Sequence, residues 1–147
     1  MSPRAQVRSA ADLLHDARAR ERAACIPEAL AGYEAAISAA DRTGEWAVLA
    51  EALRRLAVVR HHRNQSTEAR ELCRRSHAVA CASGNDVLAA EALNTLGGLD
   101  LKTGDLAEAR KHFLRASSIA PILTSIPPSV LSASEASTSL PVSHATL

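Results

Sequence analysis

The sequence predicts an all-α fold, an α-solenoid of three antiparallel helix hairpins, on two observations. The first is a period: similar residues recur every 40 positions, as in stacked-repeat proteins. The aligned sets are Leu13, Leu53 and Leu93; Ala17, Ala57 and Gly97; Glu28, Glu68 and Glu108; Ala29, Ala69 and Ala109; and Tyr33, Cys73 and Phe113. The second is composition: 47% of residues are apolar, mostly Ala and Leu, and few are aromatic. Such a core favours close helix–helix contacts.

The first repeat, about residues 9–44, predicts helices from about Ser9 to Ala24 and from Pro27 to Asp41. Pro27 suits an early helical position because its missing N–H has no partner there anyway. Asp16 stands where the later repeats carry Leu56 and Leu96. We expect this of a terminal repeat that has one face toward water.

The second repeat, about residues 45–84, predicts helices over 45–62 and 66–83. Asn64 stands between them at the position that Gly104 holds in the third repeat. After Gly, Asn is the residue that best accepts the left-handed turn ending a helix.

The third repeat, about residues 85–121, has the clearest pattern. Apolar residues at helical spacing predict a helix from Asp86 to Lys102, which Gly104 ends. Asp105 and Glu108 then predict a capping box for a second helix that runs to about Ala120. These six helices together make the predicted repeat domain, residues 9–121.

The two ends differ from the repeats. Residues 1–8 form a short N-terminal extension, and residues 122–147 are rich in Ser, Thr and Pro, which predicts a disordered tail. No polar capping helix follows Ala120, whereas repeat arrays normally end in one. A truncated or frame-shifted end is therefore one interpretation. Self-association through the uncapped C-terminal repeat is its consequence.

Charge and cysteine content exclude several classes of function. The net charge is +1, so general nucleic-acid or membrane-surface binding lacks the basic excess that it needs. No apolar run is long enough to span a membrane. Three cysteines and no secretory leader indicate a reducing, cytoplasmic setting.

The third repeat carries Leu93, Leu96, Gly97, Gly104, Ala109, Phe113, Ala116 and Pro121 at the spacing of a known repeat. This pattern resembles the tetratricopeptide repeat, W-x2-L-G-x2-Y…A-x3-F…P, with Leu93 for the Trp and Asp100 for the Tyr. The family period is about 34 residues, so the 40-residue period here indicates longer helices outside the turn. The resemblance implies a right-handed solenoid.

The resemblance also implies where a partner binds, in a groove lined by the first helix of each repeat. The predicted groove residues are Arg18, Arg54, Val58, His61, Asn94 and Leu101, with Leu14 and Glu91 beside them. The family's carboxylate clamp of Lys, Asn and Arg has no match at Leu14, Arg18, Arg55, Glu91 and Thr95. Chaperone-tail binding is therefore not expected, although Arg18 and Arg54 suit an acidic peptide.

Other chemistry has little support in the sequence. Cys73, His77 and Cys81 share one helical face, but about 12 Å along a helix separates the two thiols, too far for one zinc ion. The arginines of the middle repeat lack the aromatic partners that nucleic-acid binding would need. We expect no metal, no cofactor and no catalytic site.

The leading functional hypothesis is a non-enzymatic protein–protein interaction module that binds a peptide or protein partner in the groove. The alternative is a regulatory or oligomerisation fragment of a bacterial transcription regulator or signalling scaffold. A metal- or nucleic-acid-binding helical domain is a distant third.

Overall fold

The computed structural model describes residues 7–120, and the predicted tail at 122–147 lies outside them. Six helices make up the described chain, and each lies within a few residues of its predicted range. They are α1 (Ala10–Arg22), α2 (Ile26–Thr43), α3 (Trp46–His62), α4 (Ser66–Ala82), α5 (Asp86–Thr103) and α6 (Leu106–Ile119). The all-α prediction is confirmed.

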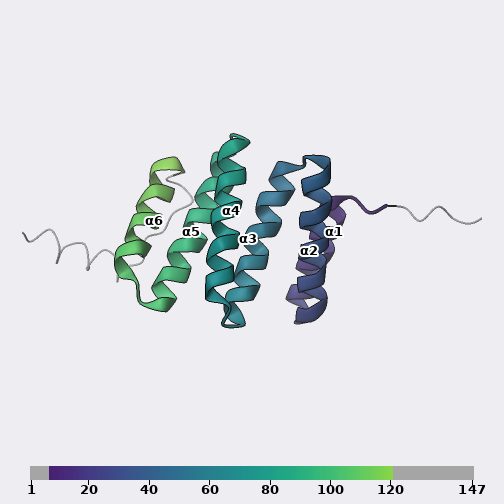
Figure 1. Ribbon diagram of the computed structural model, residues 1–147, viewed down its shortest axis with the longest axis horizontal. Coiled ribbons are helices and arrows are strands. Elements are labelled where there is room, and N and C mark those ends of the chain that lie inside the picture. The colour runs from purple at the N-terminus through teal and green to yellow at the C-terminus, as the bar shows by residue number, and fades with distance from the viewer. Residues whose placement is uncertain (1–6, 121–147) are drawn as a thin grey trace, which may run out of the picture.

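The helices pair into three hairpins that lie side by side in chain order along the long axis (Figure 1). The first helices of successive hairpins also contact one another, α1 with α3 and α3 with α5. No such contact joins α2 to α4 or α4 to α6 within the described chain. The array is therefore closer-packed along the first helices, which places α1, α3 and α5 on the inner side of the solenoid.

Small residues allow the two helices of each hairpin to cross closely. The aligned residues Ala17, Ala57 and Gly97 are all buried, and so are their partners on the second helices. A Cβ atom added at Gly97 would lie 2.8 Å from the Phe113 ring, closer than carbon atoms approach. The large residue of the third hairpin therefore requires the glycine opposite it.

One left-handed residue ends the first helix of every hairpin. Asn64 and Gly104 have φ of 63° and 83°, as the sequence predicts. Ala24 takes the same place in the first hairpin with φ of 60°, which its residue type does not suggest. The turn geometry thus repeats even where the sequence does not favour it, because the hairpin packing fixes it.

The capping-box prediction for α6 is half wrong. The Asp105 carboxylate accepts a hydrogen bond from the Glu108 N–H at 3.2 Å, as expected. The Glu108 carboxylate, however, accepts from the Lys111 ammonium at 2.9 Å instead of reaching back to the Asp105 N–H. The Asp105 N–H donates instead to the Asp100 carbonyl at 2.9 Å, so it needs no side-chain acceptor.

The first hairpin has the water-facing side that Asp16 predicts. Its carboxylate is 45% exposed and forms an ion pair with Arg8, whereas Leu56 and Leu96 at the equivalent positions are buried. The polar residue therefore marks the end of the array among the described hairpins.

Candidate functional site

A hollow of about 230 Å³ lies between α3 and α5, the two inner helices of the second and third hairpins. Its walls come from residues three or four positions apart on each helix, which places them on one face. The lining residues are Val58, His61, His62, Thr95, Gly98, Leu99 and Lys102. Two predicted groove residues, Val58 and His61, thus meet in one place.

Gly98 leaves this hollow open. A Cβ atom added there would have no heavy atom within 4 Å, in contrast to its neighbour Gly97. The open space beside Gly98 is therefore available to a side chain of a bound partner. A second glycine in a helix gives no sign in the sequence of which way it faces, so the open space at Gly98 could not be predicted.

Arg54, the third predicted residue on α3, is already paired. Its guanidinium donates to the Glu51 carboxylate at 2.9 Å and lies 3.5 Å from the Glu91 carboxylate on α5. Burial opposes ionisation of Glu51, but Arg54 and Arg55 outweigh it and lower the pKa of that carboxyl. Arg54 therefore links two inner helices through Glu91.

The other three predicted residues are spread along the inner helices. Arg18 is half-buried on α1, and no described carboxylate lies within ion-pairing distance of it. Asn94 is half-buried on α5, one turn before Gly98. Leu101 packs against Ala109 and Phe113 of α6 and lies outside the hollow.

Near Arg18, the first hairpin holds a buried tyrosine. The Tyr33 hydroxyl donates to the Glu21 carboxylate on α1. Burial, and then that hydrogen bond, raise the pKa of Tyr33 above its usual range, against the opposing charges of Arg55 and Arg18. Tyr33 is therefore a neutral structural group.

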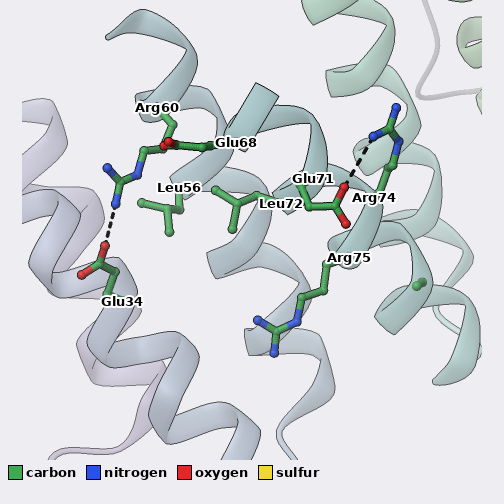
Figure 2. Close-up of a pocket in the computed structure, with 9 residues that line it drawn as sticks. Glu34, Leu56, Arg60, Glu68, Glu71, Leu72, Arg74 and Arg75 are labelled. Carbon is green, nitrogen blue, oxygen red and sulfur yellow. Dashed lines mark hydrogen bonds and ion pairs between the residues drawn. The ribbon is translucent and has the colours of Figure 1, made fainter. Parts of the chain in front are cut away.

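A larger hollow of about 720 Å³ lies between α2 and α4, with α3 behind it (Figure 2). Leu56 and Leu72 form its apolar part, and charged side chains surround them. The lining is Glu34, Leu56, Arg60, Glu68, Glu71, Leu72, Arg74, Arg75 and Ala78. Sequence reasoning missed this hollow, because it arises from the spacing between two second helices.

The charges around the larger hollow neutralise one another. Arg60 donates to Glu34 at 2.7 Å, and Arg74 lies 3.5 Å from Glu71. Arg75 lies 3.7 Å from Asp41, just outside the lining. Exposed pairs of this kind contribute little stability, yet they leave no strong field to attract a charged ligand.

The equivalent position one repeat later carries a polar network. Asp100 and His112 replace Arg60 and Leu72, and the Asp100 carboxylate, with no exposed surface, accepts from the Arg70 guanidinium. Arg70 also donates to the Thr103 hydroxyl at 2.9 Å. This polar network therefore joins the second and third hairpins at the position where a hollow lies between the first and second hairpins.

The cysteines do not gather into a metal site in the part of the chain that the structure describes. Cys73 is buried in the core, and Cys81 lies 3.4 Å from His77 at the surface. Burial raises the pKa of the Cys73 thiol to about 12. Among the described residues, no helix has the length and apolar character that a membrane crossing requires.

The helices form stacked antiparallel hairpins, and the family comparison agrees with this arrangement. The family model of the tetratricopeptide repeat matches residues 48–121, half of the chain. The chain belongs to the tetratricopeptide-repeat family. The resemblance inferred from the third repeat is thus confirmed, and tetratricopeptide repeats are in general protein–protein interaction modules and not enzymes.

Solved structures of tetratricopeptide-repeat type share the fold. BtubC (BKLC) from P. vanneervenii superposes with a TM-score of 0.70 at 19% identity, over 78% of this chain and 46% of that one. The N-terminal domain of the stress-induced protein STI-1 from C. elegans gives 0.66 at 18% identity, over 86% and 92%. No curated protein has a significant sequence match to this tetratricopeptide-repeat chain.

A kinesin-light-chain-like protein from Podospora anserina, with nearly identical TPR-like repeats, gives a TM-score of 0.61 at 21% identity. The match covers 82% of this chain and 59% of that protein. The tetratricopeptide-repeat chain thus spans about half the length of two of these structures. At such low identity, all three show the solenoid fold.

Proposed function

We propose that this protein binds a peptide segment of a partner protein in the groove along α1, α3 and α5. The open space at Gly98 carries the proposal, because it is a cavity on the inner face that no side chain of the described chain fills. The groove residues we propose are Arg18, Arg54, Val58, His61 and Asn94, with Leu101 at its far edge.

Arg54 enters this proposal in a positioning role. Glu51 on the same helix orients its guanidinium, and its ion pair with Glu91 joins α3 to α5, the two helices that form the walls of the hollow. Val58 offers the apolar contact and His61 the polar one, a combination typical of peptide-binding pockets. A partner side chain that enters beside Gly98 would contact both.

A blocking substitution tests the proposal. Peptides are first selected from a random display library on the full chain, and their affinities are then measured by fluorescence anisotropy. A Cβ atom at Gly98 meets nothing within 4 Å, and the indole of Gly98→Trp would occupy the open space, so we expect this variant to bind the selected peptides at least about tenfold more weakly. Circular dichroism checks that the variant keeps its helices.

The matched control fills the other hollow. Ala78→Trp places the same indole in the larger outer hollow between α2 and α4. We expect this variant to bind the selected peptides as the parent does. Loss of binding with Ala78→Trp and not with Gly98→Trp would move the site to the outer face and refute the groove proposal.

A further inference from the structure

Three basic side chains gather at one end of the inner groove. His61 and His62 end α3 with ring centroids 6.2 Å apart, and Lys102, in the last turn of α5, lines the same hollow. Cations at helix C-termini are ordinary, because the helix dipole favours them there. Two helices that end side by side, however, bring three such groups together.

The described chain supplies no acid to balance them. Among the described residues, no carboxylate lies within ion-pairing distance of His61, His62 or Lys102. The nearby Arg70 of α4 is neutralised by Asp100, and Glu51 and Glu91 are occupied by Arg54. The cluster is therefore a group of basic side chains beside an open cavity.

The surroundings of His61 show the same excess of positive charge. Burial, and then the charges of Lys102, His62 and Arg70, lower the pKa of His61. Its Nδ1 lies 3.2 Å from the Ser66 hydroxyl on α4, which fixes the ring. No described group bonds its Nε2, so that atom can donate to an acceptor that enters the hollow.

We propose that the hollow between His61, His62 and Lys102 binds a carboxylate side chain of an acidic partner peptide, and that this binding strengthens as pH falls. The inference rests on the proposed groove function and names its partner class. Charge complementarity is the argument: the Lys102 ammonium and two protonatable imidazoles, without a described counter-ion, line a cavity that Gly98 keeps open.

The direction of the pH effect follows from linkage. A carboxylate held beside His61 favours the protonated ring, so the complex binds more protons than the free protein does. Affinity therefore rises as pH falls through the range where histidine titrates. One proton taken up on binding corresponds to about a tenfold gain in affinity per pH unit at most.

The test uses the full chain and labelled peptides of defined charge. Peptides of alternating Glu and Ser, Gln and Ser, and Lys and Ser, together with a short oligothymidylate, are measured by anisotropy at pH 6 and pH 8. We expect the Glu peptide to bind about tenfold tighter than the Gln peptide, and tighter at pH 6. The Lys peptide and the oligonucleotide should bind weakly.

Matched variants separate the site from general electrostatics. Lys102→Gln removes one charge at the hollow, and Lys111→Gln removes one on α6, where Lys111 pairs with Glu108. We expect about fivefold weaker binding of the Glu peptide for Lys102→Gln and no change for Lys111→Gln. His61→Gln with His62→Gln should abolish the pH dependence, whereas His77→Gln should leave it.

Three results would overturn the inference: equal affinity for the Glu and Gln peptides, equal effects of the two lysine variants, or tightest binding of the oligonucleotide. The proposed function has a separate readout in the display-selected peptides. If Gly98→Trp blocks those peptides and they are not acidic, the groove stands and the acidic partner is wrong. If Gly98→Trp blocks none of them, the groove proposal itself fails.

Discussion

His112 Nδ1 lies 2.6 Å from Oδ2 of Asp100, a carboxylate with no exposed surface. The other carboxylate oxygen accepts from Arg70 of the preceding hairpin. A buried charge is tolerated only when such partners surround it. The Arg70–Asp100 pair therefore adds a buried polar link between the second and third hairpins to the apolar packing that they share.

Asp100→Asn should destabilise the protein by about 3 kcal/mol, because it leaves Arg70 and His112 without their buried counter-ion. Urea unfolding followed by circular dichroism measures the loss. The control is Asp41→Asn, since Asp41 is 56% exposed and its ion pair with Arg75 is long at 3.7 Å. We expect Asp41→Asn to lower the free energy of unfolding by less than about 1 kcal/mol. Equal losses of stability in the two variants would mean that the Asp100 network stabilises the protein no more than an exposed ion pair does.

Gly97→Ala and Gly98→Ala should change stability in opposite directions. Both gain about the same helix propensity, roughly 1 kcal/mol. At Gly97 the new methyl meets the Phe113 ring at 2.8 Å, whereas at Gly98 it meets nothing within 4 Å. Overpacking costs about 1–3 kcal/mol, so Gly98→Ala raises the melting temperature and Gly97→Ala lowers it.

A second substitution checks that cause. Phe113→Leu shortens the ring side chain opposite Gly97, so the double variant Gly97→Ala with Phe113→Leu should lose less than the sum of the two single changes. Additive losses would show that Gly97 is constrained by something other than the Phe113 ring.

Cys73 should make the protein lose stability in alkali. Its pKa is raised by burial to about 12, from a usual 9.0, so the folded state keeps the thiol proton that the unfolded state releases. The contribution is complete below pH 9 and falls by about 1.4 kcal/mol for each pH unit above it. Urea unfolding between pH 8 and pH 11 measures this slope, which Cys73→Ala should reduce.

Thiol labelling gives an independent measurement. Exposed Cys81 should react with a thiol reagent in the folded protein, while buried Cys73 should react only when the protein unfolds. Labelling of Cys73 at the rate of Cys81 would contradict its burial.

Leu114 should promote self-association. It is 44% exposed on α6, and α6 contacts only α5 among the described helices. Exposed apolar residues at an open end of a repeat array favour contact with another copy. Leu114→Glu should therefore reduce any concentration-dependent rise in mass by light scattering. Arg74→Glu, at the equivalent place on α4, is the control, and a parent that stays monomeric at high concentration would contradict the prediction.

Helix positions could be predicted from the sequence because the same pattern of buried residues and turn residues recurs in each of the three hairpins. Alignment at a period of 40 residues averages out local exceptions, so even Asp16, at a position that is apolar in the later repeats, is correctly predicted to face water. The left-handed turn at Ala24 could have been found in the same way, from its alignment with Asn64 and Gly104. The residue type of Ala24 alone does not predict a left-handed turn, because alanine rarely adopts a positive φ.

Contacts between hairpins could not be predicted so well. The ion pairs of Arg54 with Glu91 and of Arg70 with Asp100 join residues thirty or more positions apart, and each depends on the angle between hairpins. The resemblance flagged Asp100 only as a departure from Tyr. Its burial follows from a basic partner at Arg70, a pairing that no period reveals. The open space at Gly98 likewise needed the coordinates.

The two junctions of the array differ in how easily they should bend. At the second, Asp100, Arg70 and His112 fill the space between hairpins, so any change of angle must separate buried partners. At the first, the hollow beside Leu56 leaves room for movement. The His61 end of the groove is therefore rigid and the Arg18 end compliant. A bound partner would therefore contact a rigid surface at the His61 end of the groove and a surface that can shift to fit it at the Arg18 end.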